Sequence, residues 1–215
     1  MLARFSPRAR IVVGLAMVLA AVAIGLVAQF SLIAAGDREV LEEFIEMRTR
    51  AATAVMKAVT AVFNPVSAIV LALVLGALVW WRTRNRWAAA YIVGAMGVSA
   101  VITQGLKLAF RMARPDAVNQ LIVETDYGFP SGHTTAVTSL AVALALLATA
   151  QARRWSRGLV LVWVGLGVVA LLVTGSRLYL GVHWFTDVLG GFLIGAGCAV
   201  ALSVLPIGRQ DQLIE

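Results

Sequence analysis

Six long apolar segments dominate this sequence, and they restrict its fold more than any other feature. Each approaches the ~20 apolar residues that a helix needs to cross the hydrocarbon core of a bilayer. The composition agrees, because 60% of the 215 residues are hydrophobic and 13% are charged, whereas soluble domains carry about 25% charged residues. We expect membrane-spanning helices near residues 11–35, 65–81, 87–106, 134–150, 158–174 and 186–205. The predicted fold class is all-α, an integral membrane bundle of six transmembrane helices that forms a single domain over residues 1–215.

The first apolar segment follows three arginines and so resembles a secretory signal sequence. Its apolar stretch runs for about 24 residues, which exceeds the roughly 7–15 residues of a signal peptide. No convincing small-residue cleavage site closes it. We therefore expect a retained transmembrane helix.

Basic residues are spread unevenly over the loops between these segments. With six spans, the N-terminus, loops 82–86 and 151–157 and the C-terminal tail share one side, which holds ten of the 18 Lys and Arg residues but two of the 11 acidic residues. An excess of Lys and Arg marks the cytoplasmic face of a membrane protein. We expect a multi-pass protein of the cytoplasmic (inner) membrane with both termini in the cytoplasm. The net charge of +7 then reflects topology, and no nucleic-acid partner is predicted.

Residues 37–63, between the first two spans, have a different pattern. Apolar residues recur there at helical spacing beneath a charged opposite face. This pattern is typical of an amphipathic helix that lies in the membrane interface. Two interpretations remain open: a connector that shields the outer end of the bundle, or a lip through which a lipid reaches it.

The first of three polar clusters on the outward side is "KLAFRMARP", at the end of the third span. Lys107, Arg111 and Arg114 stand there at i, i+4 and i+7. In a continuous helix this spacing puts three cations on one stripe, where they repel one another unless an anion lies between them. Side chains that extend toward lipid phosphates explain the same cluster equally well.

The second cluster is "PSGH", at the start of the fourth span. Pro130 suits the first turn of a helix, because its missing N–H is spare there. Ser131 and Gly132 then offer free backbone N–H groups at the positive end of a helix, which is a ready anion site. His133 adjoins this cradle.

The third cluster is "SRLYLGVHWFTD", with Ser176, Arg177, His183 and Asp187 near the start of the sixth span. In a helix, His183 and Asp187 share a face, so the carboxylate can keep one ring nitrogen protonated and leave the other free as a nucleophile or base. A histidine beside a carboxylate is also a candidate zinc ligand. The chain holds only two histidines, and its one cysteine is remote from them, so we expect no metal site. Together the clusters supply what phosphoryl transfer needs: anion-binding groups, a nucleophile and an acid.

These three stretches, in this order, resemble the signature of the type 2 phosphatidic acid phosphatase superfamily, which also includes vanadium haloperoxidases. The chain matches K-x6-RP, PSGH and SR-x5-H-x3-D at every position, between residues 107 and 187. The resemblance implies that His183 attacks phosphorus to form a phosphohistidine. It also implies that Asp187 orients His183 and that His133 protonates the leaving oxygen.

The resemblance further implies that no metal or other cofactor takes part. The residues that it assigns to the phosphoryl oxygens are Lys107, Arg114, Ser131, Gly132 and Arg177. Arg111 lies outside the signature, so an auxiliary role for it depends on the helical stripe alone.

The function predicted from these observations is that of a membrane lipid phosphatase acting at the outer surface of the membrane, with its substrate and membrane lipids as partners. Candidate substrates are undecaprenyl diphosphate, whose recycling takes place outside the cytoplasm, phosphatidic acid and phosphatidylglycerol phosphate. A phosphotransferase that passes the phosphoryl group to a second lipid would use the same residues. A transporter with an anion-binding vestibule requires ionisable residues deep in the bundle, and the first, second, fourth and fifth predicted spans carry none between their ends.

Overall fold

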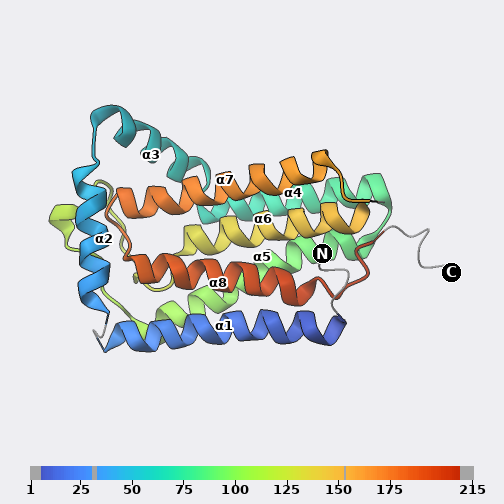
Figure 1. The fold of residues 1–215 in the computed structure, drawn as a ribbon, viewed down its shortest axis with the longest axis horizontal. Helices are drawn as coiled ribbons and strands as arrows, with labels where there is room; N and C mark the ends of the chain where they lie inside the picture. Colours follow the sequence, from blue (N-terminus) through green and yellow to red (C-terminus); the bar gives the residue numbers. More distant parts are fainter. Residues whose placement is uncertain (1–5, 31–32, 153, 209–215) are drawn as a thin grey trace.

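The computed structural model describes residues 6–30, 33–152 and 154–208, and over these residues the fold is helical and contains no strand. Six of the described helices are long and apolar enough to cross a membrane, which confirms the predicted fold class. They are α1 (Pro7–Gln29), α4 (Pro65–Thr83), α5 (Arg86–Phe110), α6 (Gly132–Gln151), α7 (Arg157–Tyr179) and α8 (Phe185–Leu202). They run alternately in opposite directions along one bundle, with α1 beginning and α8 finishing at the same end (Figure 1).

Two of the predicted spans differ from the helices at their ends. The first span was expected at 11–35, but α1 begins at Pro7, where the Ser6 hydroxyl caps it by accepting a hydrogen bond from the Ala9 N–H at 3.2 Å. Helix α1 stops at Gln29, and residues 31–32 of the expected span lie outside the described residues. The fifth span was expected to end at 174, but α7 continues to Tyr179. The "SR" of the third motif therefore belongs to the last turns of α7 and not to the sixth span.

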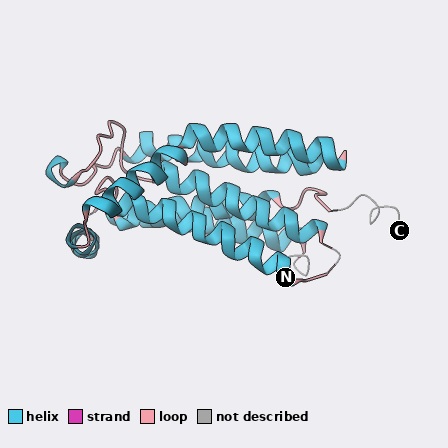
Figure 2. Cartoon of the chain, turned by 90° about the horizontal axis from the view of Figure 1, so that it is seen from above, coloured by secondary structure: helices cyan, strands magenta, loops and turns pink. Residues whose placement is uncertain are grey.

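The amphipathic segment 37–63 is two helices, α2 (Ala34–Glu46) and α3 (Arg50–Val62), and the prediction of one continuous helix was wrong. The helical conformation is interrupted around Arg48. The guanidinium of this residue donates hydrogen bonds to the carbonyls of Tyr179 at 3.0 Å and Asn119 at 2.8 Å. Thr49 then caps the start of α3. Helix α2 lies across the end of the bundle, as Figures 1 and 2 both show.

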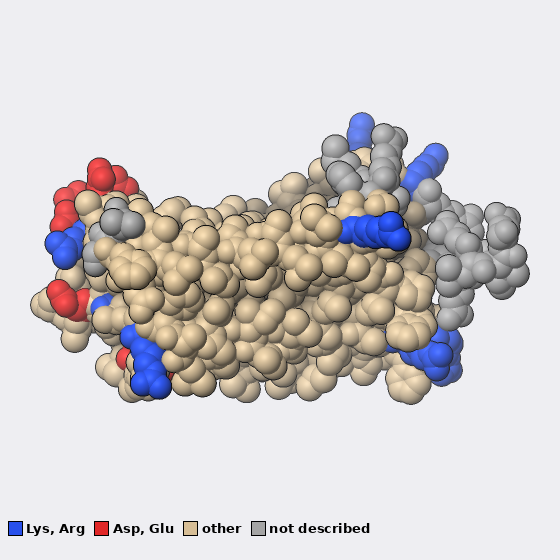
Figure 3. Space-filling model, turned by 90° about the horizontal axis from the view of Figure 1, so that it is seen from below, with Lys and Arg blue, Asp and Glu red and all other residues tan. Residues whose placement is uncertain are grey.

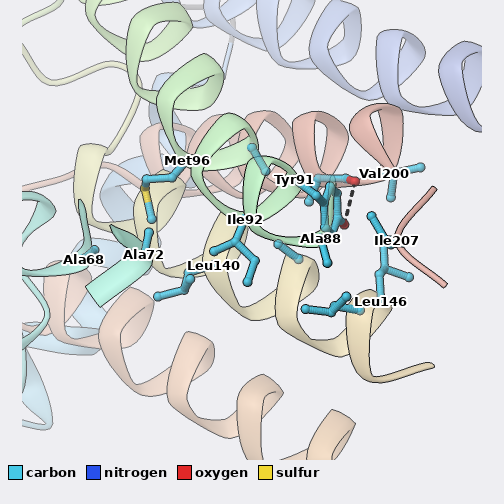
Figure 4. Close-up of a cluster of buried hydrophobic side chains, with 14 of the residues drawn as sticks. Ala68, Ala72, Ala88, Tyr91, Ile92, Met96, Leu140, Leu146, Val200 and Ile207 are labelled. Atoms are coloured by element: carbon cyan, nitrogen blue, oxygen red, sulfur yellow. Dashed lines mark hydrogen bonds between the residues drawn. The ribbon is translucent and has the colours of Figure 1, made fainter. Parts of the chain in front are cut away.

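The interior of the bundle is built around α6 and α8. In the most apolar window of each, 67% of the residues are buried, compared with 17–33% in the other four spans, whose apolar side chains face outward as lipid contact requires. The principal core cluster joins alanines and larger side chains from α4, α5, α6 and α8, and the Tyr91 hydroxyl donates a hydrogen bond to the Ala199 carbonyl at 2.9 Å within it (Figure 4).

Glycines let α8 approach the start of α6 closely. A Cβ atom at Gly191 would lie 2.6 Å from the Ser131 carbonyl oxygen, and one at Gly195 would lie 2.5 Å from that of Thr135. Both distances are too short for a Cβ atom, so glycine is required at both positions of this contact. The contact fixes the two helix ends that carry the second and third motifs beside each other.

Charged side chains gather at the two ends of the bundle. On the face drawn in Figure 3, the long middle band is free of Lys, Arg, Asp and Glu, and both acidic and basic residues lie at the end where α2 crosses. Such a band is expected of a surface that contacts lipid hydrocarbon. Of the arginines counted for topology, Arg4, Arg153 and Arg209 lie outside the described residues.

Candidate active site

A cavity of about 420 Å³ lies at the end of the bundle that α2 crosses, and residues of all three motifs line it. Its walls come from α4, the last turns of α5, the loop between α5 and α6, the first turn of α6 and the segment between α7 and α8. The polar or charged residues of its lining include Lys107, Arg114, Glu124, Asp126, His133 and His183.

Lys107 and Arg114 reach the cavity by different routes, so the expected single helical stripe is wrong. Helix α5 stops at Phe110, and Arg111 caps it in the left-handed conformation with φ 48°. Lys107 is on the last turn of α5, whereas Arg114 returns to the cavity from the loop beyond. Both side chains contact the Asp126 carboxylate, Lys107 at 3.0 Å and Arg114 at 2.5 Å.

The structure does not bring Arg111 together with these two cations. Its Nε donates to the Leu108 carbonyl at 3.1 Å, and the residue lines a second cavity beside Asp37 and Trp184. The left-handed turn at Arg111 is what directs its side chain away from the stripe that the spacing suggested.

At the start of α6, one of the backbone N–H groups that were expected to be free for an anion already has a hydrogen-bond partner. Pro130 precedes the helix, Ser131 is its N-cap, and Gly132 is the first helical residue. The Ser131 N–H is not free, because it donates to the Asp187 carbonyl at 2.9 Å. The first-turn N–H groups that follow it have no carbonyl partner within the helix. Gly132 and His133 line the cavity, so this end of α6 offers it the positive end of a helix.

His183 and Asp187 form a buried pair, with 3.1 Å between Nδ1 and Oδ2. His183 lies before the N-cap of α8, Trp184, so the pair joins the loop to the first turn and does not lie along one helix as expected. The other ring nitrogen, Nε2, is 3.0 Å from Nη1 of Arg114. A guanidinium can only donate, so Nε2 carries the lone pair and Nδ1 carries the proton that Asp187 accepts.

Electrostatics keep the His183 ring neutral. Burial, followed by the positive charges of Arg114, Arg177 and Lys107, holds the pKa of His183 well below its ordinary value. An unprotonated Nε2 beside phosphate-binding cations is the form of histidine that nucleophilic attack requires.

Arg177 is not among the residues that line the cavity, and its side chain is fully buried. Its Nη1 donates to the Thr60 hydroxyl of α3 at 2.5 Å, and its Nη2 pairs with the Glu124 carboxylate. Its buried Nε has no hydrogen-bond partner among the described residues. The hydrogen bond and the ion pair of Arg177 therefore connect α7, which carries this residue, to α3 and to the loop before α6.

Three acidic residues outside the three motifs lie beside the residues of this site. Glu124 and Asp126 pair with its cations, and their only sequence signal is their place between the first two motifs. Burial opposes ionisation of Asp126, but hydrogen bonds and charge from Lys107 and Arg114 outweigh it and lower the pKa of that carboxyl. Asp37 of α2 accepts hydrogen bonds from the Thr186 N–H at 3.0 Å and the Thr186 hydroxyl at 2.7 Å, so it caps α8 beside Asp187. Among the residues described, no group of three His, Cys, Asp or Glu side chains is arranged to hold a metal ion.

Comparison with known proteins agrees with this arrangement of fold and motifs. A sequence model described as the PAP2 superfamily matches residues 88–210, more than half of the chain. The chain therefore belongs to the PAP2 superfamily, the family that its three motifs indicated.

Two relatives and one solved structure are similar to this chain. It is 34% identical over 112 residues to phosphatidylglycerophosphatase B of Bacillus subtilis, covering 52% of this chain and 55% of that protein. It is 38% identical over 97 residues to the undecaprenyl-diphosphatase of Sulfolobus acidocaldarius, covering 42% and 41%. The matched regions thus span about half the length of these relatives. The crystal structure of a transmembrane PAP2-type phosphatidylglycerolphosphate phosphatase from Bacillus subtilis has the same fold, with a TM-score of 0.78 at 24% identity over 88% of this chain and 93% of that one.

Proposed function

We propose that this protein is a membrane lipid phosphatase that works through a phosphohistidine intermediate. The observation that carries the proposal is one cavity lined by two histidines and two buried cations at its polar end and by membrane-spanning helices on its other side. The names of the relatives, a phosphatidylglycerophosphatase and an undecaprenyl-diphosphatase, support a lipid that carries a phosphate or diphosphate.

In the first step, the lone pair on Nε2 of His183 attacks phosphorus, and the bond from phosphorus to the lipid oxygen breaks. The departing oxygen takes a proton from His133, which lines the same cavity. Asp187 holds the Nδ1 proton and stabilises the positive charge that the ring acquires. In the second step, His133 takes a proton from water, the water oxygen attacks phosphorus, the bond between phosphorus and Nε2 of His183 breaks, and inorganic phosphate leaves.

The charge of the phosphoryl group is met by cations and by the helix end. Lys107 and Arg114 line the cavity, and Arg177 adds a third positive charge beside it, where it pairs with Glu124 of the cavity lining. The free N–H groups of the first turn of α6, which begins at Gly132, complete the set of groups that bind the phosphoryl oxygens. Ser131 has an indirect role, because the hydrogen bond from its N–H to the Asp187 carbonyl connects the start of α6 to the residue that orients His183.

The apolar part of the cavity favours a lipid over a soluble phosphate ester. Pro65 and Ile69 of α4 and Met96 and Ala100 of α5 line it, and these helices belong to the lipid-facing bundle. A substrate can therefore keep its chain among apolar helices while its phosphate reaches the cations. Undecaprenyl diphosphate, phosphatidic acid and phosphatidylglycerol phosphate all meet this description.

We expect the purified protein to release inorganic phosphate from these three lipids in detergent, and to do so in excess EDTA. The reason is that both histidines and the cations already account for the nucleophile, the acid and the charge stabilisation. Phosphate release should be measured with and without EDTA, beside a His183→Ala preparation that reports contaminating phosphatases. Turnover that stops in EDTA and returns with Mg²⁺ or Zn²⁺ would contradict the metal-free mechanism, and phosphoryl transfer to an added lipid without phosphate release would make the protein a transferase.

The cavity is proposed to face outward from the cytoplasmic membrane, because the opposite loops hold most of the arginines. We expect Val118→Cys, at a position 89% exposed in the α5–α6 loop, to react with an impermeant maleimide in intact cells. Arg84→Cys, in the exposed turn between α4 and α5, should react only after lysis. Both are made in a Cys198→Ala background so that the native thiol is removed. The reverse labelling would place the cavity in the cytoplasm and exclude a role in recycling an external carrier lipid.

A further inference from the structure

Three cations of the candidate active site are each paired with a carboxylate of the loop that precedes α6. Asp126 binds Lys107 through Oδ2 at 3.0 Å and Arg114 through Oδ1 at 2.5 Å, and Glu124 pairs with Arg177. We call Glu124 and Asp126 the acidic pair. Their oxygens take the positions around the cations that the oxygens of an anionic ligand would take.

The cations and the carboxylates of these ion pairs differ in their exposure to solvent. The side chains of Lys107, Arg114 and Arg177 are 4%, 8% and 1% exposed, whereas those of Asp126 and Glu124 are 51% and 24% exposed. A buried cation without a counter-charge is strongly unfavourable, so each of the three needs an anion from the chain or from a ligand. The carboxylates border solvent and can rotate away, but the cations cannot. A phosphate that enters the cavity would therefore have to exchange with the acidic pair to contact these cations.

We propose that the acidic pair competes with the substrate's phosphate for these cations and so determines which phosphate groups the site accepts. The inference rests on the proposed function for the nature of the substrate, a lipid phosphate. The competition lowers the apparent affinity of every anion by the fraction of molecules in which the cations are free. Since this factor is the same for all anions, the apparent affinity of a weakly binding anion falls too low for it to occupy the site. A strongly binding anion still occupies it.

The lowered affinity distinguishes the proposed substrates, which bind strongly, from the surrounding lipids, which bind weakly. A phosphodiester headgroup, as in phosphatidylglycerol, carries one negative charge, whereas a phosphate monoester carries nearly two at neutral pH. Phosphodiester lipids fill the bilayer around the site and would otherwise occupy it by mass action. Two carboxylates bound to three cations leave the site with little net charge, and only a ligand with more than one negative charge displaces them well.

Titration calorimetry with inorganic phosphate tests the competition without any need for turnover, so its outcome is independent of the lipid phosphatase assay. We expect Asp126→Asn and Glu124→Gln each to bind phosphate about tenfold more tightly than wild type, as when release of the replaced carboxylate, populated in about one tenth of the molecules, is no longer required. The two replacements are isosteric and remove different carboxylates, so a folding defect in one leaves the other as a test. Asp116→Asn, in the same loop but beside the second cavity, is the matched control and should bind like wild type.

A second titration uses dihexanoyl phosphatidylglycerol as the phosphodiester probe. Wild type should give no measurable binding, and the double variant Glu124→Gln, Asp126→Asn should bind it. If each single variant binds phosphate as weakly as wild type or more weakly, the carboxylates support the site or ligate phosphate with it, and the competition is overturned. If the double variant binds phosphate more tightly but still rejects the diester, the acidic pair does not set the selectivity.

Discussion

His183→Ala should abolish turnover of every substrate, lipid or soluble, together with any acid-labile phosphoenzyme. The physical reason is that Nε2 of His183 is the neutral ring nitrogen with a lone pair beside Arg114, and no other residue of the proposed mechanism forms a bond to phosphorus. Loss of a covalent nucleophile costs on the order of 10⁴–10⁶-fold in kcat where the rest of the machinery remains. Single-turnover assays with p-nitrophenyl phosphate, combined with acid quench and detection of phosphoprotein, measure both effects.

Phosphate binding distinguishes a lost nucleophile from a lost fold in this variant. Lys107, Arg114 and the start of α6 are unchanged in His183→Ala, so the protein should still bind inorganic phosphate in a titration. Asp187→Asn is the informative companion, because it keeps the imidazole but removes the acceptor that holds the Nδ1 proton. A burst of p-nitrophenol from His183→Ala would show that another residue attacks phosphorus.

The spans could be predicted from the sequence because hydropathy and length alone decide which helices cross a membrane. The break in segment 37–63 could not, because it depends on Arg48 reaching carbonyls at Tyr179 and Asn119, which are remote in the chain.

The motifs predicted five of the residues that line the cavity, because residue type and spacing carry that information: Lys107, Arg114, Gly132, His133 and His183. Their routes into the cavity depend on backbone conformation, which spacing does not reveal. Arg111 adopts a left-handed conformation although it is not glycine, and this turn separates it from Lys107 and Arg114. Likewise, the Ser131 N–H bonds to the Asp187 carbonyl, a partner far along the chain that no local pattern indicates.

The acidic residues were missed for a related reason. Glu124 and Asp126 lie in a loop without periodicity, so only the fold shows that they meet Arg177, Lys107 and Arg114. Asp37 belongs to a helix read as amphipathic, yet its buried carboxylate caps α8. Helix α2 is thus more than a connector, because it fixes the end of the helix that carries Asp187.

His133→Ala should separate substrates by the leaving group that departs from phosphorus. A lipid alkoxide needs a proton as it leaves, whereas p-nitrophenolate is stable without one. General acid catalysis contributes about 10²–10⁴-fold, so the variant should lose about that factor in the phosphorylation step with phosphatidic acid and far less with p-nitrophenyl phosphate. The measurement is the single-turnover burst rate for each substrate, because attack of water in the second step also uses His133.

The comparison within one variant removes effects that are common to both substrates. His133 is the second residue of α6 and lines the cavity beside Gly132, so its replacement can also weaken the phosphate cradle. Such a loss lowers both burst rates by the same factor, whereas loss of a proton donor lowers only the rate of the poorer leaving group. Equal losses would therefore mean that His133 positions phosphate and that the departing oxygen takes its proton from elsewhere. A loss confined to the lipid substrate assigns the proton to His133, because the leaving oxygen of that ester is the one that needs a proton.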